Sequence, residues 1–339
     1  MNDRRRYQMR RAAAVAGSSA LLVVLAACSA GTTSASSSSS STGGASGTSS
    51  AAKTSSLTIG FSPFNQSAQA LIGLGKAATS YLGAKGDKVL VADPNNNSAT
   101  QIQQINTWVQ NGQVQGVWLL ALDTAAMKQV LQTAQSKGVV VVANGTPSQF
   151  GFSGLQPGLS FDNIDYNAYG SDVGTSLGQC LNNRFSGAGQ VILLTPAPGE
   201  AEDAAVAPFK AALAAIDPKA QIVAETAEGG DVLTNQQHTA SALQAHPNAN
   251  AVVSFHDEGT DGAIVAFQQA GKNPAKECLV NAGGSDQNLA DVASGSLYAV
   301  VALQFAADMT QTANLLIKMA ADPKAMGQQL LTPIKVITK

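Results

Sequence analysis

From residue 57 onward, short runs rich in Val, Ile and Leu alternate with stretches whose apolar residues recur at helical spacing. The runs are predicted strands and the stretches are predicted helices. In the first half of this region, strands are predicted at 57–61, 88–91, 114–120 and 139–142, and helices at 67–82, 99–109 and 124–136. Strands that are apolar on both faces need cover on both faces, so the alternation predicts a parallel sheet between two layers of helices.

The same alternation begins again after Asp162. Strands are predicted at 190–194, 221–224, 251–255, 278–281 and 297–303, and helices at 166–181, 204–216, 234–245, 259–270 and 308–320. The predicted fold class is therefore α/β, with two doubly wound parallel-sheet lobes of similar size. Because ligands of such sheets bind at the carboxyl ends of the strands, we expect a small ligand in a cleft between the lobes.

The first 27 residues have the pattern of an export signal. A cluster of arginines precedes an uncharged stretch at 12–27 that is shorter than a bilayer span. The stretch ends in Leu25-Ala26-Ala27-Cys28, which resembles a bacterial lipobox. We therefore expect a lipoprotein signal peptide at 1–27 and lipidation of Cys28, while an ordinary signal with a chance cysteine stays open. Arg10-Arg11 leaves twin-arginine export open beside the Sec route.

Residues 28–56 are dominated by Ser, Thr, Ala and Gly, a composition that cannot bury enough surface to fold. We expect this segment to be a tether with a reach of about 30 Å. With a lipid anchor, it would hold the protein at the outer face of the bacterial cytoplasmic membrane. Beyond residue 27 the chain has 15 basic and 21 acidic residues, a net charge of −6, so no nucleic-acid partner is expected.

The sequence has no Walker loop, and its Gly-x-Ser-x-Gly match at 174–178 falls inside the predicted helix 166–181 instead of the strand-to-helix turn of a nucleophile elbow. The stretch 73–78 matches a loose dinucleotide fingerprint, but it falls inside a predicted helix instead of the turn after a strand. His238, His246 and His256 have neither metal-binding spacing nor a partnering cysteine pair. We therefore expect no cofactor, no metal and no enzymatic activity.

Four short segments follow one another between the predicted elements. They are Ser62-Pro63-Phe64-Asn65-Gln66, Leu159-Ser160-Phe161-Asp162-Asn163, Ala245-His246-Pro247-Asn248-Ala249-Asn250-Ala251-Val252 and His256-Asp257-Glu258. In this order and spacing the chain resembles the type I periplasmic binding proteins, and most of all the ribose- and galactose-binding-like lipoproteins of ABC importers. The resemblance covers essentially all of 57–339. It implies a monomer that binds a small solute and partners an ABC permease.

The resemblance also implies how the chain divides between lobes. The N-terminal lobe would take 57–161 and 304–330, and the C-terminal lobe 162–303 and 331–339. Three crossings, near 160–162, 303–304 and 331–334, would then form a three-strand hinge. Ligand binding would close the two lobes by motion about this hinge.

Candidate ligand-binding residues fall in the loops that follow the strands. In the first lobe the resemblance suggests Phe64 as a stacking ring, Asn65 and Gln66 as hydrogen-bonding amides, and Asn144. In the second lobe the candidates are Glu202, His256, Asp257 and Asp286, and Gln304 is a further candidate at the return crossing into the first lobe. Sugar sites combine short polar side chains of this kind with an aromatic ring. Structural roles stay open for Phe64 in lobe packing, for His256, and for Glu202 in capping the next helix.

One departure from the family concerns charge. The arginine with which relatives grip a ring hydroxyl would fall within 200–205, and no arginine is present there. The predicted site therefore has acidic and amide groups but no fixed cation. This argues against phosphorylated and carboxylate ligands, and it leaves neutral sugars, polyols or a cationic solute.

Cys180 and Cys278 both fall in the second lobe, at the edge of the sheet away from the predicted cleft. A disulfide between them and two unpaired buried thiols are both open.

Together these features predict a membrane-tethered receptor that captures a small neutral sugar or polyol for an ABC importer. One alternative is a ligand-sensing partner of a membrane signalling receptor, and another is an importer receptor for an amino acid or other small polar solute. An extracellular enzyme is a third, for which the sequence shows no pair of nucleophile and base.

Overall fold

A computed structural model describes residues 56–339 of the chain. The predicted signal peptide, the predicted lipidation site Cys28 and nearly all of the predicted tether lie outside the described residues. Within them, no helix combines the length and the apolarity that a membrane crossing requires.

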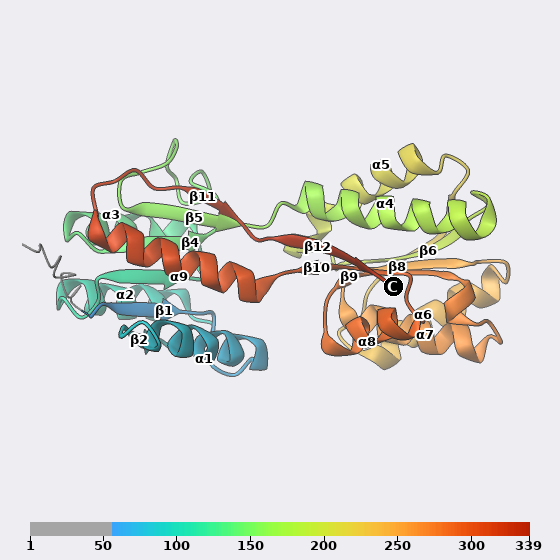
Figure 1. Cartoon of the computed structure of the whole chain (residues 1–339), viewed down its shortest axis with the longest axis horizontal. Helices are drawn as coiled ribbons and strands as arrows, with labels where there is room; N and C mark the ends of the chain where they lie inside the picture. The colour runs from blue at the N-terminus through green and yellow to red at the C-terminus, as the bar shows by residue number, and fades with distance from the viewer. Residues whose placement is uncertain (1–55) are drawn as a thin grey trace, which may run out of the picture. The chain divides into compact units, whose positions relative to one another are not determined.

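The first lobe is built on a six-stranded parallel sheet with the order β11-β5-β4-β3-β1-β2 (Figure 1). Its strands are β1 (Thr58–Ser62), β2 (Lys88–Val91), β3 (Gly116–Leu119), β4 (Val140–Asn144), β5 (Leu159–Asn163) and β11 (Gln329–Leu331). Its helices are α1 (Gln69–Gly83), α2 (Ser98–Gln110), α3 (Lys128–Ser136) and α9 (Phe305–Ala321). One core cluster packs α1 and α9 on one face of the sheet, and a second packs α2 and α3 on the other.

The second lobe has a six-stranded sheet with the order β12-β10-β9-β8-β6-β7, parallel except that β12 runs antiparallel to β10. Its strands are β6 (Gln190–Thr195), β7 (Gln221–Ala227), β8 (Ala251–Ser254), β9 (Cys278–Gly283), β10 (Ala299–Leu303) and β12 (Ile334–Thr338). Its helices are α4 (Tyr166–Phe185), α5 (Val206–Ile216), α6 (Val232–Ala245), α7 (Asp257–Gln269) and α8 (Asp286–Ser294). Short 3-10 segments lie at Ala125–Met127, Ala201–Ala205 and Pro274–Lys276.

Helices cover both faces of the second sheet as well. Tyr169, Val173 and Phe209 bring α4 and α5 onto one face, and Phe267 and Val292 bring α7 and α8 onto the other. Both sheets are therefore buried between helices, and the predicted α/β fold with two parallel-sheet lobes is confirmed. The sequence missed β5, α8, β11 and β12, because these are short elements without a long apolar run.

The chain passes between the two sheets three times: after β5, between β10 and α9, and between β11 and β12. Backbone hydrogen bonds join the three passing segments. The Thr332 N–H donates to the Asn163 carbonyl at 3.0 Å, and the Gln304 N–H donates to the Pro333 carbonyl at 2.8 Å. These segments correspond to the three crossings that the sequence predicts as a hinge.

A disulfide joins Cys180 to Cys278 in the second lobe. Cys180 lies in the last turns of α4, and Cys278 is the first residue of β9. The bond therefore lies at the amino ends of the strands, away from the edge where a ligand is expected. Of the two states that the sequence left open, the structure has the bonded one.

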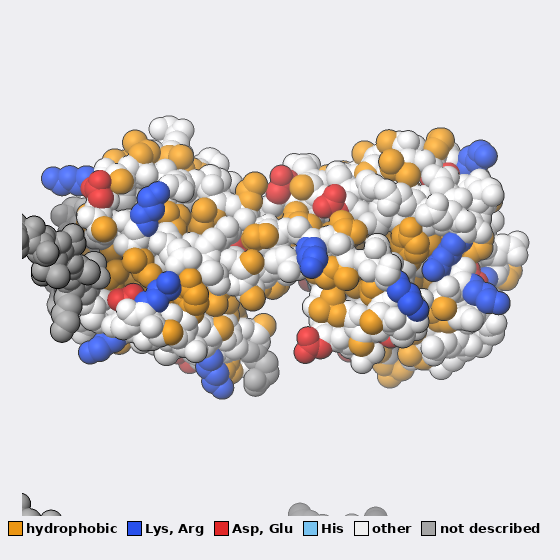
Figure 2. Space-filling model, in the orientation of Figure 1, with side chains coloured by type: hydrophobic (Ala, Val, Ile, Leu, Met, Phe, Trp, Pro, Cys, Tyr) orange, Lys and Arg blue, Asp and Glu red, His pale blue; other side chains and the backbone are white. Residues whose placement is uncertain are grey.

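Basic side chains are few and scattered. On the face shown in Figure 2, Lys and Arg lie singly and are separated by uncharged surface. This distribution agrees with the acidic balance of the chain beyond residue 27 and offers no cationic surface on this face for nucleic acid.

Candidate functional site

A pocket of about 340 Å³ lies at the carboxyl ends of the strands of the second sheet. We refer to it as the C-lobe pocket. Its lining comes from α4, from the 3-10 segment after β6, and from the residues that follow β8, β9 and β10. The residues that matter for its chemistry are Tyr169, Glu202, His256, Asp257, Ser285 and Phe305. This is the edge at which parallel α/β sheets bind their ligands.

His256 and Glu228 form the central charged pair of the pocket. His256 Nδ1 lies 2.8 Å from Glu228 Oε2, and the Glu228 side chain is only 2% exposed. The hydrogen bond with Glu228 raises the pKa of His256 to about 9, although burial opposes the rise and the nearby Glu200 and Glu202 carboxylates add to it. His256 is therefore an imidazolium at neutral pH. The sequence predicts no fixed cation in the site, and His256, which lies outside the segment 200–205 where relatives carry an arginine, supplies one.

The buried Glu228 carboxylate is held by several donors. Its Oε1 accepts from the Phe255 N–H at 2.7 Å and from the Ser254 hydroxyl at 3.0 Å. Gly259 makes room for it, because a Cβ at Gly259 would lie 2.9 Å from the carboxyl carbon of Glu228. The sequence did not single out Glu228, which follows an exposed edge strand and lies 28 residues before His256.

Asp257 lies at the start of α7, where the helix dipole stabilises a negative charge. Its Oδ1 accepts from the Gly284 N–H at 2.9 Å and from the Ser285 N–H at 3.3 Å. A side chain at position 283 would overlap this oxygen, so Gly283 leaves the space in which the carboxylate docks. Asp257 thereby fixes the turn between β9 and α8 and also lines the pocket.

Aromatic rings supply the apolar part of the lining. Tyr169 is buried, and burial raises its pKa, with a further contribution from the Asp257 carboxylate. Burial also raises the pKa of Tyr166 to about 12, and the Glu202 carboxylate adds to this rise. Phe305, the first residue of α9, is 57% exposed beside the pocket. A ring exposed in this position can stack on the C–H face of a sugar.

The candidates in the first lobe lie in the loop after β1. Asn65 Oδ1 accepts from the Ala68 N–H at 2.8 Å and from the Ser67 N–H at 3.0 Å, and its amide donates to Asn96. Phe64 is half-buried in the same loop. The side chain of Asn65 therefore organises its own loop and the one after β2.

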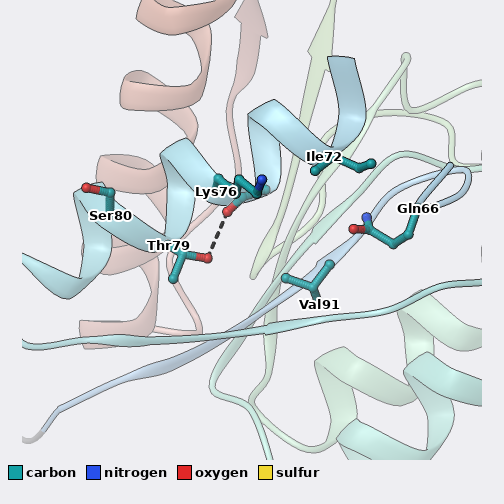
Figure 3. A pocket seen from close by; sticks show the side chains of 7 residues that line it. Gln66, Ile72, Lys76, Thr79, Ser80 and Val91 are labelled. Carbon is teal, nitrogen blue, oxygen red and sulfur yellow. Dashed lines mark hydrogen bonds between the residues drawn. The ribbon is translucent and has the colours of Figure 1, made fainter. Parts of the chain in front are cut away.

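Gln66 faces a second pocket, of about 360 Å³, between α1 and the edge strand β2 (Figure 3). Figure 3 shows Ile72, Lys76 and Thr79 of α1 across from Val91. The Thr79 hydroxyl is turned back to its own helix, where it donates to the Gly75 carbonyl at 2.8 Å. This pocket has few polar groups free to bind a ligand, so we place the candidate site in the C-lobe pocket.

Three further candidates have local roles in the structure. Asn144 Oδ1 accepts from the Ala121 N–H at 2.7 Å, which ties the loops after β3 and β4 together. Asp286 is exposed in the first turn of α8 and does not line the C-lobe pocket. Gln304 donates to the Ala302 carbonyl at 3.4 Å, while its neighbours Leu303 and Phe305 line the pocket.

Of the predicted residues, the structure brings Glu202, His256 and Asp257 together in the C-lobe pocket. Sequence reasoning missed Glu228, Tyr169 and Phe305. Only Phe305 had a usable signal, since it is an aromatic residue directly after Gln304 at a predicted crossing.

Comparisons with known proteins agree with this architecture. The family model of the periplasmic binding protein domain matches residues 59–325. The ribose import binding protein RbsB of Bacillus subtilis is 24% identical over 247 residues, which are 73% of this chain and 76% of RbsB.

Two solved structures share the fold. One is a periplasmic solute-binding protein of an ABC transporter from Actinobacillus succinogenes with bound D-allose. Its TM-score is 0.68 and its sequence identity is 16%, and the match covers 84% of this chain and 98% of that chain. The other is the Caulobacter myo-inositol binding protein bound to myo-inositol, with a TM-score of 0.64 and 19% identity over 84% and 93% of the two chains. The family model spans most of the 339 residues, which confirms the resemblance seen in the sequence: the chain belongs to the periplasmic binding protein domain family.

Proposed function

We propose that this protein is a substrate-binding protein that captures a small sugar or polyol and delivers it to an ABC permease. One observation carries the proposal. At the carboxyl ends of the second sheet, the carboxylates of Glu202 and Asp257 and the imidazolium of His256 converge beside the exposed ring of Phe305. Directional polar groups next to a ring are what a polyhydroxylated ligand with apolar C–H faces requires.

The named proteins that share this family or fold support the class of ligand. They include a ribose import binding protein and structures with bound D-allose and myo-inositol. These ligands are all small polyhydroxylated rings. Our proposal for this chain combines that pattern with the chemistry of its own pocket.

The proposed mechanism is a shift of population between an open and a closed form. The ligand would contact Glu202, His256 and Asp257 in one lobe and the loop at 62–68 in the other, with the three crossing segments acting as the hinge. A ligand that touches both lobes only in the closed form stabilises that form, which the permease then recognises. No bond is made or broken in this proposal.

The proposed location is the outer face of the bacterial cytoplasmic membrane. The lipobox-like Leu25-Ala26-Ala27-Cys28 and the Ser-rich segment that follows support a lipid anchor with a tether, and the family is periplasmic by name. A monomeric receptor on such a tether can reach a permease in the same membrane.

A thermal-shift screen of the purified full-length protein tests the ligand class. The panel contains pentoses, hexoses, cyclitols, amino acids and polyamines. A ligand at about 100 times its Kd adds about 2.7 kcal/mol of stability, so a sugar or cyclitol should raise the Tm clearly.

The variant that tests the site is His256→Gln, which keeps a hydrogen-bonding side chain and removes the charge. It should abolish the shift, whereas Asp203→Asn, a change on the neighbouring 3-10 segment outside the pocket lining, should preserve it. Shifts confined to amino acids would show that the proposed ligand class is wrong.

A further inference from the structure

Apart from His256, the loops at the carboxyl ends of the parallel strands contain no cationic side chain. No lysine or arginine occurs at 63–68, 92–97, 120–124, 145–158, 164–165, 196–205, 228–231, 255–256, 284–285, 304 or 332–333. Lys128 lies outside these stretches in the sequence, but its ammonium donates to the Gly151 carbonyl at 2.7 Å and lies over the Phe152 ring. The lack of lysine and arginine in these stretches holds for both lobes.

The one cation of the C-lobe pocket is already neutralised. His256 binds Glu228 through Nδ1 at 2.8 Å, and its Nε2 lies 3.9 Å from Glu200 Oε2. Glu202, Asp257 and Glu258 also line the pocket, and among residues 56–339 none of the three has a cationic partner. The pocket therefore carries an excess of negative charge that an anionic ligand would meet unfavourably.

A second, independent observation concerns a buried acceptor next to the pocket lining. Asn281 is fully buried, and its Oδ1 has no hydrogen-bond donor in the described part of the chain. Its amide donates to Thr260 Oγ1 at 2.7 Å and to the His256 carbonyl at 3.3 Å, which fixes its orientation. The free Oδ1 lies 2.7 Å from the position that a Cβ would have on Gly283, a residue of the pocket lining.

Buried acceptors without donors cost free energy unless a ligand supplies the donor. Asn281 Oδ1 and the carboxylates of Glu202 and Asp257 are all acceptors, so a well-matched ligand presents N–H or O–H groups to each. A hydroxyl satisfies one acceptor but leaves the charge uncompensated. An ammonium group donates three hydrogen bonds and also neutralises a carboxylate.

We propose that the ligand is a polyol that carries a protonated amine, that is, an amino sugar or an aminocyclitol. The ammonium lies against Glu202, hydroxyl groups donate to Asp257 and Asn281, and the ring stacks on Phe305. The inference rests on the proposed function and narrows it, because it selects the cationic members of the sugar and polyol class over the neutral ones that the sequence favoured.

Matched ligands that differ in one group test the inference. Isothermal titration of the full-length protein compares D-glucosamine, D-glucose, N-acetyl-D-glucosamine and D-glucuronate, together with the galacto and manno series and inosamine against myo-inositol. In at least one series the amine should bind about five- to tenfold more tightly than its neutral partner, as expected for one partly buried charge pair. The acid should not bind, and the preference should weaken as salt is added.

Glu202→Gln keeps the shape of the side chain and should remove the preference for the amine over its neutral partner. Asp203→Asn is the matched control and should keep the preference. Glu258→Gln, at an exposed position of the lining, serves as a second test and should weaken the preference even if Glu202→Gln unfolds the lobe.

Failure of the amine preference and failure of the proposed function give different binding results. Neutral sugars that bind as tightly as their amines in every series would overturn this inference and leave the proposed function standing. Binding of linear polyamines or amino acids with no sugar or cyclitol bound would overturn the proposed function itself.

Discussion

His256 and Glu228 form an ion pair that holds the C-lobe pocket together. Glu228 is nearly inaccessible to water, so its charge depends on the donors that surround it. Because the pKa of His256 is raised from 6.5 to about 9 in the fold, the pair stabilises the folded state fully below pH 6.5 and loses this contribution as the pH rises through 9.

His256→Gln should destabilise the protein by about 1–3 kcal/mol at pH 6, because a buried carboxylate loses its charged partner. It should also remove the decline in stability between pH 6.5 and 9 that we expect for the wild type. Urea unfolding at pH 6 and pH 9.5 measures both effects. His246→Gln, at the end of α6, is the control and should retain the decline. An unchanged pH profile in His256→Gln would mean that the pair is not formed.

Asp162 and Asp308 form a second coupled pair where the chain passes between the sheets. Burial raises the pKa of Asp162 to about 7, and the Asp308 carboxyl adds to the rise. Burial raises the pKa of Asp308 as well. The Thr312 hydroxyl donates to Asp162 Oδ2 at 3.2 Å, while Oδ1 has no donor among the described residues.

The folded-state pKa of Asp162 lies above its ordinary value of 3.8, so this group favours folding in its protonated form. Its contribution is present below pH 3.8 and is lost as the pH rises through about 7. Asp162→Asn mimics the protonated carboxyl, and we expect the variant to be more stable than the wild type above pH 7 and less dependent on pH below it. Thermal unfolding from pH 4 to 8 checks this, with Asp203→Asn as the exposed control. Parallel profiles for wild type and Asp162→Asn would contradict it.

Helix α4 packs against α5 through a stripe of glycines. Gly170, Gly174 and Gly178 recur at every fourth position and so lie on one face. A Cβ at Gly174 would overlap the Phe209 carbonyl and lie 2.9 Å from the Ala212 Cβ. The close approach of the two helices therefore depends on the absence of side chains at these positions.

Gly174→Ala should destabilise the second lobe by about 1–3 kcal/mol, because the added methyl group forces the two helices apart. Gly73→Ala is the matched control: it lies within α1, where a Cβ would meet nothing within 4 Å. This change should stabilise the protein by about 0.5–1 kcal/mol through helix propensity alone. Urea denaturation gives both values, and equal effects of the two substitutions would exclude close packing of α4 on α5.

The Cys180–Cys278 disulfide connects α4 to β9 across a sequence separation of 98 residues. Closing so long a loop restricts the unfolded chain, and its removal should cost about 2–5 kcal/mol. A reducing agent should therefore lower the Tm of the wild type to that of Cys180→Ala/Cys278→Ala, and it should have no effect on the double variant. A Tm that is insensitive to the reductant would show that the bond adds no stability.

For the molecule as a whole, the predicted lipid anchor at Cys28 would keep the ligand-binding lobes at the membrane. Cys28→Ser removes the thiol that a lipid would modify. In a bacterial host, we expect this variant to leave the membrane fraction for the medium or periplasm, with the same ligand-induced Tm shift as the wild type. Fractionation and immunoblotting measure the distribution, and Ser29→Ala should stay with the membrane. Membrane retention of Cys28→Ser would argue against the lipid anchor.

The α/β architecture could be predicted because its signals are local. Valine runs such as 139–142 predict strands, and the periodic stretches between such runs predict helices, from consecutive residues alone. The apolar composition of the runs also indicates that the sheet is buried on both faces. The family resemblance depended on the order of short segments, which is also a property of the sequence. Elements without such signals were missed: β11 has only three residues, and α8 has a short, largely polar sequence.

The pocket depends on residues that are distant in the chain and on the direction of individual side chains. Periodicity placed His256 and Asp257 after a strand, but nothing in it could pair His256 with Glu228 or dock Asp257 over the turn after β9. For the same reason the sequence could not show that Asn144 and Asn65 hold neighbouring loops together by hydrogen bonds, and their role in ligand binding stays a prediction. Secondary structure and family can be read along the chain because they follow from neighbouring residues, whereas charge pairing, the disulfide and the unsatisfied acceptor of Asn281 arise only when folding brings separate loops into contact.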